Sequence, residues 1–137
     1  GSVEWKAQPL MSPLEEFVQL AKDAEAKISA TFNSPDVLPF TTRALAIIQS
    51  NLDKRREFEH EFMNMSHYAP SEFVEVCMHA LRWPAVKQEF ERRQREAVER
   101  NDWRAEPVYR HYLEAFDPDW DDAKDFFVEY FGSRGEA

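Results

Sequence analysis

The stretch "SEFVEVCMHALRWP", Ser71–Pro84, decides the fold. Its apolar residues recur at spacings of three and four, which predicts a helix with one buried face: Phe73, Val74, Cys77, Ala80 and Leu81. The sequence "RWP" ends this helix, because Pro84 suits the first position of a following helix. Ser71, followed by Glu72, is expected to cap its start. Two helices joined by so short a link are expected to be antiparallel neighbours.

Helix start and stop signals also divide the N-terminal half. Ser12 followed by Pro13 predicts the N-cap and the first position of a helix, which should run to about Phe32. The sequence "NSPDVLP", residues 33–39, contains two prolines and several turn-forming residues. This composition predicts a loop between the first helix and the next one.

The helix that follows the loop has an irregular apolar pattern. We expect Thr41 or Thr42 to cap it. Its apolar stripe slips across "DKRRE", residues 53–57, before Phe58 resumes it. The slip predicts a kink, or a change of packing neighbour, near residues 54–56.

The helix that begins at Pro84 is predicted to bury Val86, Phe90 and Ala97. Asn101 suits the left-handed residue that often ends a helix, and Asp102 suits the N-cap of the next one. A fifth helix follows with an inner face of four residues: Tyr109, Tyr112, Leu113 and Phe116. A last helix is expected from about Trp120 to Phe131.

These signals predict an all-α single domain of five to six helices that spans residues 1–137. The C-terminal half is expected to form two stacked antiparallel helical hairpins, and one irregular α-domain is the alternative. Residues 1–10 are expected to be flexible, with a cloning remnant at residues 1–2. Residues 132–137 are expected to form a tail.

Composition narrows the class of protein. The chain has 137 residues, of which 43% are hydrophobic, enough for a core without disulfides. The single cysteine, Cys77, cannot form an intramolecular disulfide and fits a reducing compartment, so we expect a cytoplasmic protein. We find no signal peptide and no apolar run near the roughly 20 residues that cross a bilayer. No membrane association is therefore expected.

The net charge of -9 argues against nucleic acid as a partner, because the phosphates would be repelled.

The negative charge is concentrated near the C-terminus. Residues 114–137 hold 8 acidic and 2 basic residues, a net charge of -6 out of the total of -9. The densest part is "FDPDWDDAKDFF", residues 116–127, which has three possible interpretations.

A calcium site is the first interpretation of this stretch. The aspartates at 117, 119 and 121 match the first ligand positions of an EF-hand loop. However, Asp122 stands where that loop needs glycine, and Val128 stands where it needs a bidentate glutamate. The mismatches argue against calcium, and no metal site is predicted here.

Helix capping is the second interpretation. Asp119 is placed to cap a helix that starts at Trp120, and Asp121 and Asp122 then lie in its first turn. Negative charge at that position is favoured by the helix dipole, and a cap stabilises by about 1 kcal/mol. Asp117 before a proline is ordinary turn chemistry.

A partner-binding surface is the third interpretation. On a helical projection from Trp120, the aromatic residues share one arc and the acidic residues share the opposite arc: Asp121, Asp122, Asp125 and Glu129. Like charges four residues apart cost a few tenths of a kcal/mol each. Their retention favours a cationic partner, and a solvated acidic surface is the alternative. With Asp117, these acids are our candidate partner-binding residues.

Few other residues suggest chemistry. Glu57 and His60 have the spacing of half a di-iron carboxylate site, but no second Glu-x-x-His occurs, and salt-bridged surface histidines are the alternative. Cys77 lies on the inward stripe and is expected to act as a small hydrophobe. Trp83 and Trp103 lie at helix ends, either as packing anchors or as interface hot spots. Without a nucleophile-elbow, zinc-protease or P-loop motif, we predict no catalytic residue and no cofactor.

The run "ALRWP…NDWRAEPVYRHYLEAFDPDWDDAKDFF" within residues 80–127 resembles small helical HEAT-like bacterial proteins, some of which resemble immunity proteins of polymorphic or contact-delivered toxins. The resemblance consists of packing and capping residues and carries no catalytic motif. It implies a protein that binds and occludes a basic surface or active site of a toxin. A helical adaptor with another protein partner is the alternative, and a metal-dependent helical enzyme that uses His60 and Glu57 is a further one.

Overall fold

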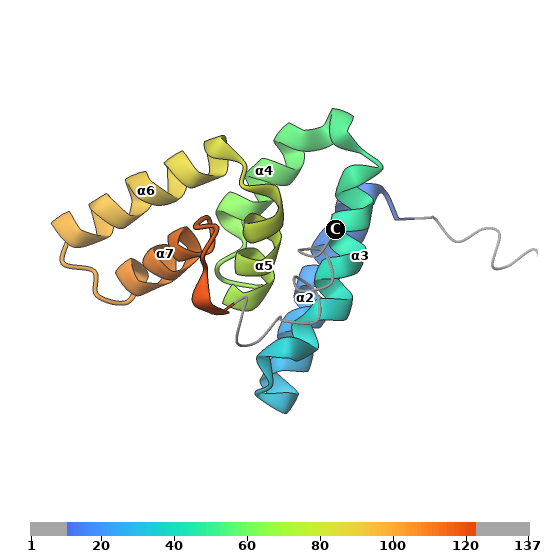
Figure 1. Ribbon diagram of the computed structural model, residues 1–137, viewed down its shortest axis with the longest axis horizontal. Helices are drawn as coiled ribbons and strands as arrows, with labels where there is room; N and C mark the ends of the chain where they lie inside the picture. The colour runs from blue at the N-terminus through green and yellow to red at the C-terminus, as the bar shows by residue number, and fades with distance from the viewer. Residues whose placement is uncertain (1–10, 123–137) are drawn as a thin grey trace, which may run out of the picture.

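The computed structural model describes residues 11–122 (Figure 1). These residues form an all-helical single domain, as predicted. The described part holds six α-helices and two short 3-10 helices, with these bounds: α2 Pro13–Thr31, η1 Ser34–Val37, α3 Leu38–Gln49, η2 Leu52–Lys54, α4 Arg55–Asn64, α5 Ser71–Leu81, α6 Pro84–Glu99 and α7 Ala105–Glu114.

The start and the end of α2 follow local sequence signals. The Ser12 hydroxyl accepts a hydrogen bond from the Glu15 backbone N–H at 3.1 Å, and the Glu15 carboxylate accepts one from the Ser12 N–H at 2.8 Å. This reciprocal arrangement satisfies two backbone donors that a helix start leaves free. At the other end, Phe32 adopts the left-handed conformation (φ 53°), and its N–H donates to the Ile28 carbonyl. Both predicted boundaries are confirmed.

The predicted loop at residues 33–39 is mostly helical, so this prediction is wrong. Ser34–Val37 forms η1, which leads directly into α3 at Leu38. Pro39 lies in the first turn of α3, where a helix does not need its missing N–H. Thr41 and Thr42 are therefore both inside the helix, and its N-cap is Val37. Thr41 is buried, and its hydroxyl donates to the Leu38 carbonyl at 3.1 Å.

The slip in the apolar stripe after α3 corresponds to a break in the helix. The chain leaves α3 after Gln49, passes through η2 and starts α4 at Arg55. Helix α3 packs on α2 and α5, whereas α4 packs mainly on α6. The predicted change of packing neighbour is confirmed, and the break occurs a few residues earlier than expected.

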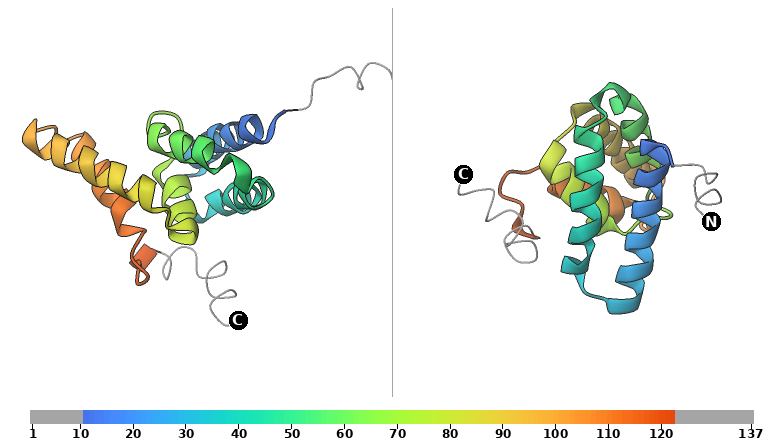
Figure 2. Two further views of the ribbon diagram at one scale, coloured as in Figure 1. Left: turned by 90° about the horizontal axis from the view of Figure 1, so that it is seen from above. Right: turned by 90° about the vertical axis from the view of Figure 1, so that its right-hand side faces the viewer.

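Helix α5 lies at the centre of the molecule, between the α2–α3 pair and the α6–α7 pair (Figures 1 and 2). Every residue from Phe73 to His79 is buried, so the helix is covered on all sides rather than on one face. Its N-cap is Pro70, and Ser71 is already the first helical residue, which corrects the predicted cap. Ala80, expected to point inward, is exposed.

The antiparallel pair of the C-terminal half is α6 with α7, and not α5 with α6 as predicted. The link between α5 and α6 consists of Arg82, which is left-handed (φ 50°), and Trp83, which is extended. So short a link turns the chain through a corner and leaves α5 and α6 with few mutual contacts. The longer link after α6 reverses the chain. It uses Asn101, which is left-handed (φ 58°) as predicted. The N-cap of α7 is Arg104 and not Asp102 as predicted, although the Asp102 carboxylate accepts the Ala105 N–H at 3.1 Å.

Aromatic rings fill the core on both sides of α5. On the α2 side, the ring centroid of Phe17 lies 5.2 Å from Phe58, 5.1 Å from Phe62 and 5.9 Å from Phe73. On the α7 side, the Phe90 ring lies 4.9 Å from the Tyr112 ring. Rings at these separations in tilted or edge-on arrangements add to the stabilisation that burial provides.

The outer face of α6 carries ion pairs between residues about one turn apart. Arg100 lies 3.9 Å from Glu96 one turn earlier, and Glu89 pairs with both Arg92 and Arg93. Within residues 11–122, none of the helices is both long enough and apolar enough to span a bilayer.

Replacing Trp83 tests the packing at the link between α5 and α6. Trp83 is 5% exposed, its ring packs edge-on against Phe62 at 6.0 Å, and the Arg55 guanidinium lies over it at 4.8 Å. We predict that Trp83→Ala lowers the free energy of unfolding by about 3–5 kcal/mol in urea titration. The matched control is Trp103→Ala, because Trp103 is 75% exposed and its loss should change stability by less than about 0.5 kcal/mol. Equal losses for the two variants would contradict this packing.

Candidate functional site

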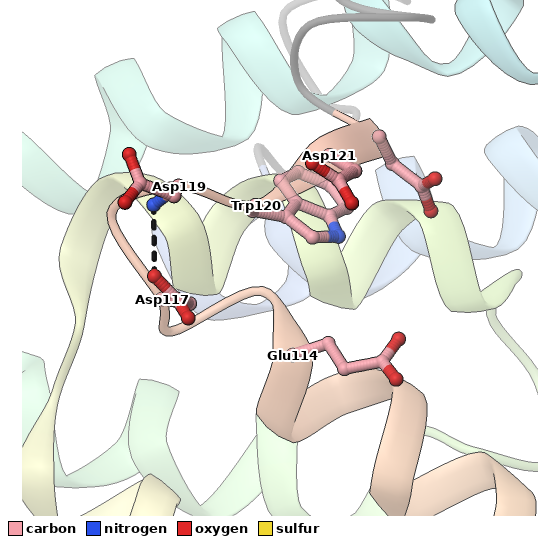
Figure 3. Close-up of a pocket in the computed structure, with 6 residues that line it drawn as sticks. Glu114, Asp117, Asp119, Trp120 and Asp121 are labelled. Atoms are coloured by element: carbon pink, nitrogen blue, oxygen red, sulfur yellow. Dashed lines mark hydrogen bonds between the residues drawn. The ribbon is translucent and has the colours of Figure 1, made fainter.

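Five carboxylates and one tryptophan line a pocket of about 340 Å³ at the C-terminal end of α7 (Figure 3). We call this surface the acidic corner, and its residues are Glu114, Asp117, Asp119, Trp120, Asp121 and Asp122. They come from the last residue of α7 and from the turn that follows it. The structure thus brings together three of the predicted partner-binding residues: Asp117, Asp121 and Asp122.

A hydrogen-bonded turn gives the acidic corner its shape. The Asp117 carboxylate accepts the Asp119 backbone N–H at 2.8 Å, shown as the dashed line in Figure 3. The Asp117 carbonyl accepts the Trp120 N–H at 3.1 Å. An aspartate that bonds the backbone two residues on is typical turn chemistry and confirms the expected role of Asp117. Most of the helix that Asp119 was expected to cap falls outside the described residues.

Two buried polar residues of α5 lie under this turn. His79 Nδ1 lies 2.9 Å from the Ala115 carbonyl oxygen, so Nδ1 carries the proton and donates it. The His79 ring also lies 5.1 Å from the Trp120 ring. Burial lowers the pKa of His79, although the bond to Ala115 acts in the opposite direction. The hydrogen bond from His79 to Ala115 therefore attaches the turn to α5.

Glu75 is the second buried polar residue, one helical turn before His79. It is 7% exposed. Burial raises the pKa of Glu75 to about 8, against a hydrogen bond from Ser71 that lowers it. The negative charges of Asp122, Glu72 and Glu114 raise this pKa further. Glu75 is therefore mostly protonated at neutral pH, while the carboxylates that surround it carry the negative charge.

The acidic corner is open to solvent. Asp117, Asp119 and Asp121 are exposed, and Asp122 is half-buried. Glu114 is exposed as well and pairs with His111, with Nδ1 3.2 Å from the carboxylate. The remaining two predicted acids, Asp125 and Glu129, lie outside the described residues, as does most of the amphipathic helix predicted for residues 120–131.

The two candidate tryptophans have different environments. Trp83 is a core residue, so the packing role is the one that the structure shows, and it offers almost no surface to a partner. Trp103 is exposed, and the neighbouring Arg104 guanidinium lies 5.7 Å from the ring centroid. It precedes α7, whose 10 residues extend about 15 Å, so Trp103 and the acidic corner lie at opposite ends of that helix. Trp103 is therefore not a packing anchor.

The described residues show no side-chain arrangement that supports metal or cysteine chemistry. Glu57 and His60 are exposed, and the His60 ring lies near the Asn64 amide at 3.4 Å. Within residues 11–122, no three histidine, cysteine or carboxylate side chains converge to hold a metal ion. Cys77 is fully buried, and its burial raises the pKa of the thiol well above the usual value. A thiol of this kind is a small hydrophobe, as predicted, because a reactive cysteine needs access and a lowered pKa.

Sequence reasoning missed the part that Glu75 and His79 play beneath the acidic corner. Their spacing of four residues was visible, but histidines were expected to form salt bridges at the surface. Within residues 11–122 only His111 does so, with Glu114, whereas His79 is buried. The signal that could have found them is position: Glu75 and His79 fall between apolar residues of a helix that is almost continuously apolar.

Comparison of the chain with profiles of protein families, with curated proteins and with solved structures finds no match.

The response to divalent ions tests whether the acidic corner is a metal site. We predict that the melting temperature is the same in 1 mM EDTA and in 1 mM CaCl₂ or MgCl₂, because the carboxylates face solvent without converging. If the ion concentration were 100 times the Kd of such a site, binding would stabilise the folded chain by about 2.7 kcal/mol. That would raise the melting temperature by roughly 5 °C or more. A rise of this size would contradict the assignment.

Proposed function

We propose that this chain is a toxin-neutralising protein of the immunity type, which binds a cationic surface of a toxin through the acidic corner. The observation that carries the proposal is the unbalanced charge at this corner. Asp117, Asp119 and Asp121 are exposed, and no lysine or arginine in residues 11–122 forms an ion pair with any of them. Elsewhere on the described surface, acids such as Glu16, Glu89 and Glu96 have arginine partners.

The acidic corner can attract a basic surface electrostatically and can hold a cationic side chain in its pocket. Carboxylates gathered on one side raise the rate of encounter with a basic surface and orient it on arrival. The pocket of about 340 Å³ has room for a cationic side chain beside the Trp120 ring. A lysine or arginine that belongs to a toxin's basic active site would be neutralised there and withdrawn from its substrate. This mode of action needs no catalytic residue in the binding protein.

Trp103 extends the proposed surface. It lies about 15 Å from the acidic corner, at the start of α7. A standard protein interface buries about 800 Å² on each partner, a patch roughly 30 Å across, so one partner can contact both. An exposed tryptophan beside an arginine is typical of residues that slow dissociation, while the acids govern association. We place the encounter in the cytoplasm, where the free thiol of Cys77 would remain reduced.

Charge reversal at the corner tests the proposed interface. We predict that Asp119→Lys combined with Asp121→Lys lowers the association rate constant for a cognate toxin domain by about 10-fold or more at low ionic strength. Surface plasmon resonance measures this rate. The control, Asp23→Lys with Glu25→Lys, makes the same change in net charge at exposed positions of α2. Equal rates for the two double variants would exclude the acidic corner as the contact.

A growth assay separates the two candidate functions, which are neutralisation of a toxin and an adaptor role. The assay uses cells that express the same toxin domain. Neutralisation predicts that the wild-type chain restores growth and that the corner variant does not. An adaptor, the second candidate, would bind the domain without restoring growth. Binding without protection would therefore reject the neutralising function and retain the interface.

A further inference from the structure

A second polar pocket, of about 250 Å³, lies where the end of α4 meets the α6–α7 pair, at the opposite end of α7 from the acidic corner (Figure 1). We call it the arginine pocket. Its lining includes Arg92, Arg93 and Arg100 but a single acid, Glu96. Three positive charges and one negative charge leave the lining with a net charge of +2, although the whole chain carries -9. Ala105, the first residue of α7, also lines the pocket, so the positive end of that helix dipole lies beside it.

Two of these arginines already hold an anionic group between them. Arg92, Glu96 and Arg100 are spaced four residues apart and therefore form one row along α6. In this row, one oxygen of the Glu96 carboxylate accepts a hydrogen bond from Arg92, and the other lies 3.9 Å from Nη1 of Arg100. The Glu96 side chain is 46% exposed, so it can turn out to water. The pair of guanidiniums is thus arranged to bind an oxyanion, and the group that it binds now is a mobile carboxylate of the same helix.

Arg93 and Tyr109 supply further donors from fixed positions. Arg93 donates to the Met63 carbonyl of α4, to Glu89 of α6 at 2.6 Å and to the Tyr109 hydroxyl of α7 at 3.3 Å. These bonds to three helices hold a guanidinium whose side chain is only 23% exposed. They use three of its five N–H groups, so two have no acceptor among the described residues. The Tyr109 hydroxyl accepts from Arg93, and its own hydrogen is left to donate to a ligand.

The acids around the arginine pocket limit what can bind. Glu89 and Asp102 also pair with these arginines, although neither is among the lining residues. With them, three acids balance the three arginines, so attraction over a long distance is weak. Binding therefore depends on the donors inside the pocket and requires that the ligand displace Glu96. The displacement removes surface ion pairs, which contribute little to stability.

We propose that the arginine pocket binds a phosphate group, which displaces the Glu96 carboxylate and takes its place between Arg92 and Arg100. A phosphate group offers three acceptor oxygens and up to two negative charges, so it can also accept from Arg93 and Tyr109. The volume of about 250 Å³ is below the roughly 300–1,000 Å³ of sites that enclose a whole small molecule. The pocket therefore holds the phosphate group and leaves the rest of a phosphorylated molecule outside. This proposal does not rest on the toxin-neutralising function.

Titration of the full chain with inorganic phosphate, followed by NMR of the arginine Nε–Hε groups, tests the proposal. The titration is made at pH 7 and at constant ionic strength, so that general screening does not change. We expect saturable shifts of the Arg92 and Arg93 signals with a Kd of about 1 mM or tighter. Glu96→Gln removes the competing carboxylate and should tighten binding about 10-fold, whereas Arg100→Gln removes a charged donor and should weaken it about 10-fold.

Arg43→Gln is the matched control. Arg43 is also a surface arginine paired with a glutamate, Glu16, and its side chain is 58% exposed against 61% for Arg100. It lies on α3, so its loss should leave the affinity unchanged. Three results would overturn the proposal: no saturable shift in the wild-type chain, equal weakening in Arg43→Gln and Arg100→Gln, or binding by Glu96→Gln that is no tighter than wild type.

A parallel titration with ribose 5-phosphate distinguishes the two sources of a phosphate group. Tighter binding of the ester supports the proposal and assigns the pocket to phosphorylated small molecules. Binding of inorganic phosphate that is at least as tight supports it as well and assigns the pocket to the free ion.

Discussion

Burial of α5 on every side is the constraint on which the rest of this structure depends. A helix of 11 residues that is covered all round needs neighbours on opposite faces. Helices α3 and α7 supply them, and each brings its own antiparallel partner, α2 or α6. The two-residue link through Trp83 fits this plan because it turns the chain out of the centre instead of folding α6 back along α5. The aromatic rings on either side then fill the space between the central helix and the two pairs.

The candidate site arises from the polar exceptions within this central helix. A buried histidine and a buried carboxyl group need hydrogen-bond partners, because each buried polar group without one destabilises the fold by about 1–3 kcal/mol. His79 takes the backbone carbonyl that follows α7, and Glu75 keeps its proton and bonds to its own helix. The turn bearing the acidic corner is thereby fixed to the core. Exposed carboxylates on a firmly attached turn suit the recognition of a cationic partner, since little further ordering is needed on binding.

Local features of this fold could be predicted from the sequence, and long-range ones could not. The cap at Ser12 and the left-handed Asn101 depend on a few neighbouring residues, and the structure confirms them. The pairing of α6 with α7 depends instead on how sharply the Trp83 link turns, which no periodicity reveals. The same limit applies to the tryptophans. Both lie at helix ends, yet Trp83 is buried because the Phe62 ring comes from a distant helix, while Trp103 has no such neighbour in the described residues.

Native-state hydrogen exchange tests the central role of α5 most directly. The account predicts that the backbone amides from Val76 to His79 are among the slowest in the described part of the chain and exchange only by global unfolding, with the free energy found by urea titration. The amides near the exposed end of α6, around Val98, should exchange through local opening at lower free energy. Exchange of the α5 amides by local opening, as fast as those at the end of α6, would contradict the account.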